Sequence, residues 1–189
     1  MVFDNGPVSG NIGGWEIDSV AGPLYFVSDS FTVSAPTSLA SVTAGLWVSA
    51  GSAPTSLQWQ IGTTSGGNQI SSGTSSLSDI LLGLSGGVDP GFDVYESTFA
   101  INGTVGAGTY YLTLKDAQAT GGSSVDWDQN NGPASALVYY PGGSLSEGSE
   151  SFQVYDATVP EPSTWFAGVM ALLALAPGAF RNLRRRITA

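Results

Sequence analysis

The 189-residue sequence contains no cysteine and no histidine. Their absence excludes disulfides, cysteine nucleophiles, zinc sites built from Cys and His, and a Ser-His-Asp triad. Charged residues are also scarce, at 11% against a typical value of about 25%. The chain instead has 26 glycines and 10 prolines, which is typical of a protein rich in turns. These features favour an exported all-β domain over a cytosolic enzyme.

Basic residues are almost confined to the C-terminal end. Lys115 is the only one before the last nine residues, and the other four are Arg181, Arg184, Arg185 and Arg186. All 15 acidic residues precede them. Because so acidic a body repels phosphate backbones, we expect no nucleic-acid partner.

A segment without charge, residues 164–180, lies directly before the arginines. As a helix it would be roughly 26 Å long, at the short end of the range for a membrane span. Trp165 and Phe166 stand at one edge, where interfacial aromatic residues occur. The pattern predicts a transmembrane helix over 164–180 and a basic cytoplasmic tail over 181–189, which places the body outside the cell. A buried helix of a soluble domain is the alternative.

The motif Pro160-Glu161-Pro162 stands just before this segment. A Pro-Glu-Pro tripeptide, an apolar segment of membrane length and an arginine-rich end, in this order at the C-terminus, resemble the PEP-CTERM sorting signal of exopolysaccharide-producing bacteria. The resemblance covers residues 159–189 and implies that an exosortase, an integral-membrane transpeptidase-like enzyme, recognises the signal and cuts near the tripeptide. The two prolines favour an extended segment, as a processing enzyme needs. A plain proline-rich linker is the alternative.

The N-terminus, residues 1–6, has no basic region, apolar stretch or small-residue cleavage site of a signal peptide. Because the body is expected outside the cell, we expect a signal peptide encoded upstream of Met1. The predicted organisation is an extracytoplasmic domain (1–156), a Pro-Glu-Pro linker (157–163), the transmembrane helix and the basic tail.

Short runs with a period of two recur through the body between turn residues, and helical periodicity is absent before Thr164. They predict strands within 15–17, 26–27, 31–33, 42–48, 57–61, 99–101, 110–115, 125–127, 136–140 and 152–154. The expected fold is an antiparallel β-sandwich, jelly-roll-like. Residues 77–84 are ambiguous between a helical turn and a strand, and Gly83 and the short length of the segment favour a packed loop there. Segments 30–33, 57–61, 108–114, 127–132 and 149–152 also resemble a sandwich domain common in PEP-CTERM proteins, which implies no enzymatic activity.

Three oxygen-bearing side chains, Asp126, Asp128 and Asn130, follow one another at alternate positions. This spacing begins a calcium-loop pattern. The sequence departs from this pattern in two places. The glycine, Gly132, falls at the seventh position and not at the sixth, and the twelfth position is Leu137 and not Glu. A turn stabilised by Asp and Asn is the alternative. The two aspartates, roughly 7 Å apart on a strand, could also form the carboxylate pair of a glycoside hydrolase.

Trp47 and Tyr111 are predicted to face away from the apolar sets of their strands. Aromatic rings exposed in this way can stack on sugars, so both are candidates for a glycan platform. A place in the core is the alternative.

The leading hypothesis is a surface or extracellular-matrix protein, not an enzyme, with a structural or adhesive role linked to exopolysaccharide or biofilm. It is anchored in the membrane through its C-terminus and then processed to a cell-surface or extracellular form. Its expected partners are an exosortase-like enzyme, the membrane and exopolysaccharide. No cofactor other than calcium is expected. The alternatives are a carbohydrate-binding module with the same anchor and an acid-dependent hydrolase.

Overall fold

The computed structural model describes residues 1–18, 25–87 and 89–157. Met1–Ala157 is a compact unit by itself. The Pro-Glu-Pro motif, the predicted transmembrane helix and the four arginines lie outside the described residues. Within the described part of the chain, no helix has the length and apolar character that a membrane crossing requires.

Strands make up nearly all regular structure of the described body, and one short 3₁₀ helix, η1 (Thr120–Gly122), joins them. In chain order the strands are β1 (Phe3–Asp4), β2 (Gly14–Glu16), β3 (Phe26–Val33), β4 (Thr37–Ser49), β5 (Pro54–Gly62), β6 (Ser71–Ser76), β7 (Ser78–Leu84), β8 (Phe92–Val105), β9 (Gly108–Ala119), β10 (Val125–Asn130), β11 (Ala136–Tyr140), β12 (Gly143–Ser146), β13 (Ser149–Glu150) and β14 (Phe152–Asp156). The predicted all-β class is therefore confirmed for the described residues.

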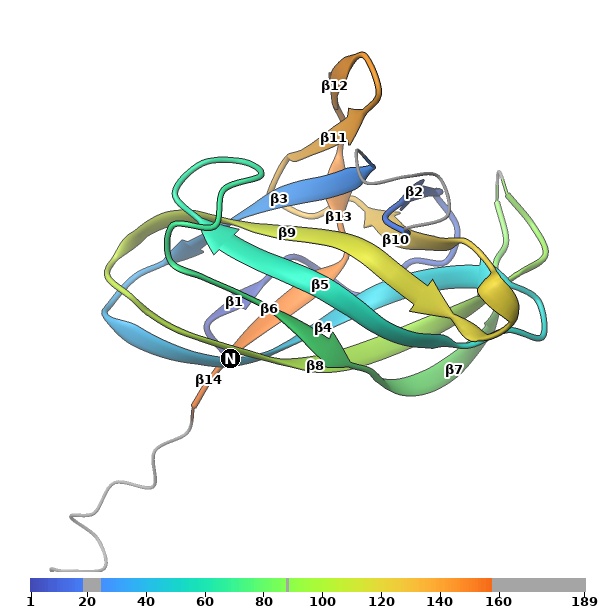
Figure 1. Cartoon of the computed structure of the whole chain (residues 1–189), viewed down its shortest axis with the longest axis horizontal. Helices are drawn as coiled ribbons and strands as arrows, with labels where there is room; N and C mark the ends of the chain where they lie inside the picture. The colour runs from blue at the N-terminus through green and yellow to red at the C-terminus, as the bar shows by residue number, and fades with distance from the viewer. Residues whose placement is uncertain (19–24, 88, 158–189) are drawn as a thin grey trace, which may run out of the picture. The chain divides into compact units, whose positions relative to one another are not determined.

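The strands form two antiparallel sheets (Figure 1). The first has the order β1-β14-β4-β10-β13, with β8 on the other side of β4, β7 beyond β8, and β2 beside β10. The second has the order β12-β11-β3-β9-β5-β6. The long strand β4 organises the first sheet, because it pairs with β8 along one side and with β14 and then β10 along the other.

Side chains from both sheets share one hydrophobic core. The alternation within strands explains which residues enter it. Leu57, Trp59 and Ile61 of β5 are buried as predicted, and so are the inward residues of β9 and β4: Tyr110, Leu112, Leu114, Val42, Ala44, Leu46 and Val48. Trp127 and Phe152 extend the core from β10 and β14, with their ring centroids 5.6 Å apart. The two apolar faces thus bury each other.

Two segments differ from their sequence-based expectation. The runs 26–27 and 31–33 belong to one strand, β3, because Ser28 and Asp29 between them are buried and hydrogen-bonded. The packed loop expected over residues 77–84 is wrong, since this segment is strand β7, paired with β8 through a register shift between Leu81 and Gly83. Gly83, with a φ of 140°, accommodates that irregularity instead of ending the strand.

Gly45 of β4 lies where the N-terminal segment crosses the first sheet. A Cβ atom at this position would meet the Ser151 Oγ, the Asp128 Cβ at 2.8 Å and the Val8 Cγ1 at 2.8 Å. These neighbours belong to three separate parts of the chain, and a Cβ would have to displace all of them together. Only glycine permits the close approach.

We therefore expect Gly45→Ala to lower the free energy of unfolding by about 2 kcal/mol, the usual cost of overpacking. Chemical denaturation measures this change. Gly106→Ala is the matched control, because its Cβ would only touch the Tyr110 hydroxyl at 3.9 Å. Equal stability of the two variants would contradict the close packing at Gly45.

Candidate functional site

The residues of the predicted calcium loop lie on a strand. Asp126, Asp128 and Asn130 all belong to β10, where alternate residues share one face. Val125 and Trp127 occupy the other face and enter the core. The segment is thus neither a calcium loop nor a free turn, because β10 is held between β4 and β2 by antiparallel pairing.

Asp128 is fully buried and holds the N-terminal segment against the sheet. Its Oδ2 accepts from the Ser9 N–H at 2.7 Å, and its Oδ1 accepts from the Gly10 N–H at 2.9 Å and from the Trp47 Nε1–H at 2.8 Å. Burial raises the pKa of Asp128, while these donors act in the opposite direction. The carboxylate therefore serves as an anchor for separate parts of the chain.

Trp47 is not available to a sugar. Its side chain is 1% exposed, because its face of β4 lies beneath other residues, and its indole N–H is committed to Asp128. The prediction of an exposed platform at Trp47 is wrong for this reason. Tyr111 is half-buried on β9 of the other sheet, so the two aromatic residues do not form one surface.

A calcium ion does not fit the oxygen atoms of this strand. Asp128 already accepts N–H donors at both oxygens. Asn130 donates from its Nδ2 to the Asn5 carbonyl at 2.6 Å and accepts the Gly132 N–H at its Oδ1. Within residues 1–18, 25–87 and 89–157, no three acidic side chains are grouped so that they could hold a metal ion. The geometry of these residues does not support the calcium hypothesis.

Asp126 lies in an acidic cluster beside Glu16, its cross-strand partner on β2. Burial, followed by the charges of Glu16, Asp18 and Asp89, raises the pKa of Asp126 to about 7. Burial and Asp18 also raise the pKa of Glu16. We therefore expect the Asp126 carboxyl group to titrate near neutral pH. Asp128 cannot complete a catalytic pair with it, because the hydrogen bonds that enclose Asp128 leave no oxygen facing a substrate.

A second group of buried acids escaped the sequence analysis. Asp29 of β3 accepts the Glu150 N–H at 2.8 Å and the Ser30 N–H at 2.6 Å, and the Asn5 Nδ2 donates to it at 3.0 Å. Burial raises the pKa of Asp29 to about 6. Asp29 stands between Val27 and Phe31 at alternate positions of β3, where an apolar residue is expected. This interruption of the apolar alternation is the sequence feature that could have indicated a buried acid.

Glu150 of β13 is fully buried, and both of its carboxyl oxygens have no hydrogen-bond partner among the described residues. Burial, and next the charge of Asp29, raise the pKa of Glu150 well above its ordinary value. Burial therefore favours the neutral form of this side chain over its ionised form. A protonated carboxyl without a partner costs stability, so this residue marks a weak point in the packing.

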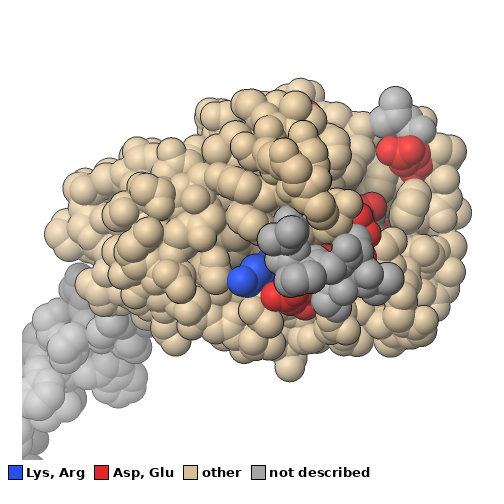
Figure 2. Space-filling view, turned by 45° about the horizontal axis from the view of Figure 1, so that its top comes forward, with Lys and Arg blue, Asp and Glu red and all other residues tan. Residues whose placement is uncertain are grey.

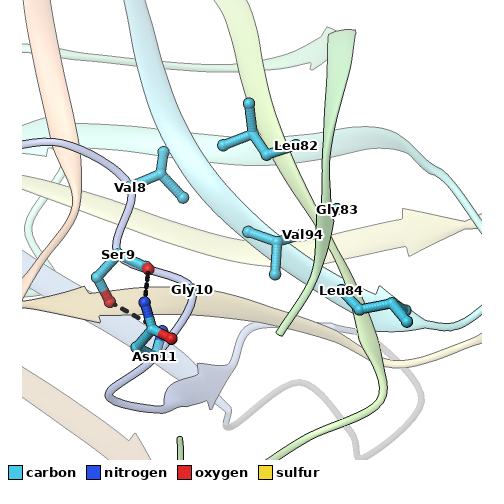
Figure 3. Close-up of a pocket in the computed structure, with 8 residues that line it drawn as sticks. All are labelled: Val8, Ser9, Gly10, Asn11, Leu82, Gly83, Leu84 and Val94. Carbon is cyan, nitrogen blue, oxygen red and sulfur yellow. Dashed lines mark hydrogen bonds between the residues drawn. The ribbon is translucent and has the colours of Figure 1, made fainter. Parts of the chain in front are cut away.

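A pocket of about 250 Å³ lies next to the N-terminal segment that Asp128 anchors (Figure 3). Val8, Ser9, Gly10 and Asn11 line one side, and Leu82, Gly83, Leu84 of β7 and Val94 of β8 line the other. Asn11 is fixed locally, since its Nδ2 donates to the Ser9 carbonyl at 2.6 Å. The pocket wall therefore depends on Asp128, which binds Ser9 and Gly10.

Asp128→Asn tests the anchor. The amide keeps the shape of the carboxylate but places an N–H group toward the donors of Ser9 or Gly10, so we expect a loss of about 2 kcal/mol in the free energy of unfolding. Hydrogen exchange should become faster at the Ser9 and Gly10 amides before the rest of the body opens. Asp156→Asn, on a partly exposed residue at the end of β14, is the control. Unchanged exchange at both amides would contradict the anchoring role.

Glu150→Gln tests the buried acid. The folded body holds the proton of Glu150 more tightly than the unfolded chain does, so its ionisation adds no cost below about pH 4.5 and a growing cost as the pH rises. We expect the stabilisation by Glu150→Gln, relative to the parent chain, to be small at pH 4 and to grow toward pH 7. Urea unfolding across this range measures it.

Glu96→Gln, the same exchange on a half-buried residue of β8, is the control. A difference between Glu150→Gln and the parent chain that stays constant from pH 4 to pH 7 would contradict the assignment of a buried neutral acid.

Comparison of the chain with protein-family models, with curated proteins and with solved structures gives no match in any of the three. Two features of the chain therefore bear on its function: the arrangement of the side chains on β7, β8, β10 and the N-terminal segment, and the sequence pattern that follows Ala157.

Proposed function

We propose that this chain is an exported, C-terminally sorted bacterial protein of the PEP-CTERM type, with a structural or adhesive role at the cell surface or in the extracellular matrix. The observation that carries the proposal is the order of three features after the body: Pro160-Glu161-Pro162, the apolar residues 164–180 and the arginine cluster. An exosortase-like enzyme is the proposed processing partner, and the membrane is the proposed anchor before processing.

The position at which the body ends supports this proposal. β14 is the last strand of the described residues, and the Ala157 N–H donates to the Ser38 carbonyl at 2.9 Å, three residues before Pro160 in the sequence. No core residue of the described body lies beyond Val154. Cleavage near the tripeptide would therefore leave every described strand and its hydrogen bonds in place.

The burial of the acidic residues inside the body supports a structural role. Asp29, Asp128 and Glu150, whose pKa values burial raises, lie among strands and do not line an open cleft. We take the two antiparallel sheets as a jelly-roll-like sandwich, the arrangement expected of an exported module. Such a module presents a surface and does not require a reaction centre. No cofactor is part of the proposal.

The carbohydrate-binding alternative, which would connect the protein directly to exopolysaccharide, now depends on Tyr111 alone. Trp47 no longer contributes, and the neighbours of Tyr111 across β3 and β5 are Ser30 and Gly62. One half-buried ring provides less stacking area than a pair would. We therefore place the structural role first.

The sorting proposal predicts two separable phenotypes in a bacterium that carries an exosortase. Deleting residues 166–189 should move the exported chain from the membrane to a soluble fraction, since the apolar segment is lost. Replacing Pro160, Glu161 and Pro162 by alanine should leave the chain in the membrane but block its maturation. Fractionation and mass spectrometry of the mature C-terminus measure both results.

The matched control replaces Thr158 by alanine, because this residue lies directly before residues 159–189, which the resemblance to the sorting signal covers. This variant should be processed normally. A mature form of unchanged size and location in the Pro-Glu-Pro variant would remove the main support of the proposal, whatever the behaviour of the deletion.

A further inference from the structure

The sequence contains three Asn-Gly pairs, which are Asn5-Gly6, Asn102-Gly103 and Asn131-Gly132. An asparagine followed by glycine is prone to spontaneous loss of its side-chain amide, because glycine has no Cβ to hinder its backbone nitrogen. The first and third pairs are also both followed by proline. The pairs therefore share their local chemistry, and the fold decides how they differ.

Asn5 is locked inside the body, where its side chain is fully buried. Its Nδ2 donates to the Ser149 Oγ at 2.6 Å and to the Glu150 carbonyl at 2.7 Å. Its Oδ1 accepts the Ala134 N–H at 3.1 Å. The Asn5 side chain cannot turn toward the Gly6 nitrogen without breaking these bonds, so the fold protects this pair.

Asn102 is exposed but restrained. Its Oδ1 accepts the Ser71 hydroxyl at 2.5 Å. Asn102 and Gly103 both belong to β8, and Gly103 is paired with Leu39 of β4. This pairing restricts the backbone rotation that would bring the Gly103 nitrogen to the Asn102 side chain.

Asn131 has neither kind of restraint. It is exposed, it directly follows the last residue of β10, and its side chain makes no hydrogen bond with any residue of the described body. A pocket of about 270 Å³ lies beside it, and Gly132 and Ile12 are among the residues that line this pocket. Such a volume is large enough for water. The Asn131 side chain is thus free to turn, and water can reach it.

The two glycine nitrogens that precede proline are held in the same way. The Gly132 N–H donates to the Asn130 Oδ1 at 2.9 Å, and the Gly6 N–H donates to the Asp4 Oδ1 at 2.9 Å. These equivalent bonds do not distinguish the two pairs. The difference between them lies in the asparagine side chains alone.

We propose that Asn131 is a site of spontaneous deamidation. The Gly132 nitrogen gives its proton to water and attacks the Asn131 Cγ, and the bond from Cγ to the side-chain nitrogen breaks. Ammonia leaves after taking up a proton from water. A second step adds water to one of the two carbonyls of the cyclic imide, which leaves either aspartate or isoaspartate. The net reaction consumes one water and releases one ammonia, and it does not depend on the sorting signal or on processing.

Isoaspartate at position 131 would disturb a tight contact. Gly132 packs on Asn5, since a Cβ at Gly132 would meet the Asn5 Oδ1 at 2.7 Å and the Ser149 Oγ at 2.8 Å. On the other side of Asn131, the Asn130 Nδ2 donates to the Asn5 carbonyl at 2.6 Å. Isoaspartate adds one carbon to the backbone between these two contacts, so both cannot be kept. Aspartate leaves the backbone length unchanged and therefore keeps them.

Both products also carry one negative charge more than asparagine. Lys115, drawn in blue in Figure 2, is the only basic side chain of the described body. Deamidation therefore makes an acidic body more acidic, and anion exchange separates the product from the parent chain.

Incubation of the full chain in detergent micelles at mildly alkaline pH tests the proposal. Peptide mapping by mass spectrometry assigns the modified residue, and an isoaspartyl methyltransferase labels isoaspartate. We expect the rate at Asn131 to exceed the rates at Asn5 and Asn102 about tenfold or more, a ratio that corresponds to about 1.4 kcal/mol in activation free energy. In urea, which removes the fold, the three rates should converge.

Freshly purified Asn131→Asp is the matched control for the consequence, because it has the charge of the product on an unchanged backbone. Hydrogen exchange at the Ala134 amide, which donates to Asn5, reports on the contact. We expect this amide to exchange faster in material enriched in isoaspartate than in the parent chain, and at the parental rate in Asn131→Asp.

Three results would overturn the proposal. The first is a rate at Asn131 that does not exceed the rate at Asn102 in the folded chain. The second is a ratio between Asn131 and Asn5 that urea does not change, which would assign the difference to the sequence and not to the fold. The third is equal exchange of the Ala134 amide in the isoaspartate material and in Asn131→Asp, which would show that the contact with Asn5 survives.

Discussion

The carboxylate of Asp128 joins three parts of the chain that are distant in sequence. Its oxygens accept hydrogen bonds from Ser9 and Gly10 in the N-terminal segment and from Trp47 on β4, while its own backbone belongs to β10. Hydrogen bonds to a charged group are stronger than neutral ones, and the enclosed carboxylate would be costly without them. The covering of Trp47, the course of residues 8–11 and the wall of the pocket beside β7 all follow from this one interaction.

Burying a carboxylate inside the body costs stability, and hydrogen-bond donors offset this cost only at some of the acidic residues. Asp29 and Asp128 each receive several donors, so their negative charge is tolerated. Glu150 receives none among the described residues, and burial raises its pKa well above the ordinary value. Because burial raises the pKa of Asp29, Asp128 and Glu150, each of them lowers the stability of the body as the pH rises, and the hydrogen-bond donors at Asp29 and Asp128 offset part of this cost.

The surface properties divide the molecule in a similar way. The described body has many more acidic than basic side chains, and such an excess disfavours phosphate-bearing partners. β7 is the exception, because its leucines are exposed on an edge that carries one charge. An acidic body with a localised apolar edge and a tail of opposite charge has a distinct chemistry at each of the three places. The proposed sorting depends on the tail.

Several features could be predicted from the sequence because they depend on local pattern. Alternation at Leu57, Trp59 and Ile61 indicates a strand with one buried face, and the structure places these residues in the core. The interpretation of residues 77–84 failed, since Gly83 resembles a loop residue although it only accommodates an irregularity within β7. The prediction of an exposed Trp47 failed for a different reason. The alternation of β4 correctly places Trp47 on the face opposite the core residues of that strand, but the sequence cannot show that Asp128 and the N-terminal segment cover this face.

Local sequence pattern is sufficient to predict the all-β class, the period of most strands, the acidity of the body and the order of motif, apolar segment and arginines in the tail. These properties are carried by neighbouring residues and need no knowledge of distant contacts. Contacts between distant segments are needed to make Asp128 an anchor of the N-terminal segment, to bury Glu150 without a hydrogen-bond partner among the described residues, and to place the leucines of β7 on an exposed edge. Each of these outcomes depends on groups from other parts of the chain, brought close by antiparallel pairing and by the packing of the N-terminal segment.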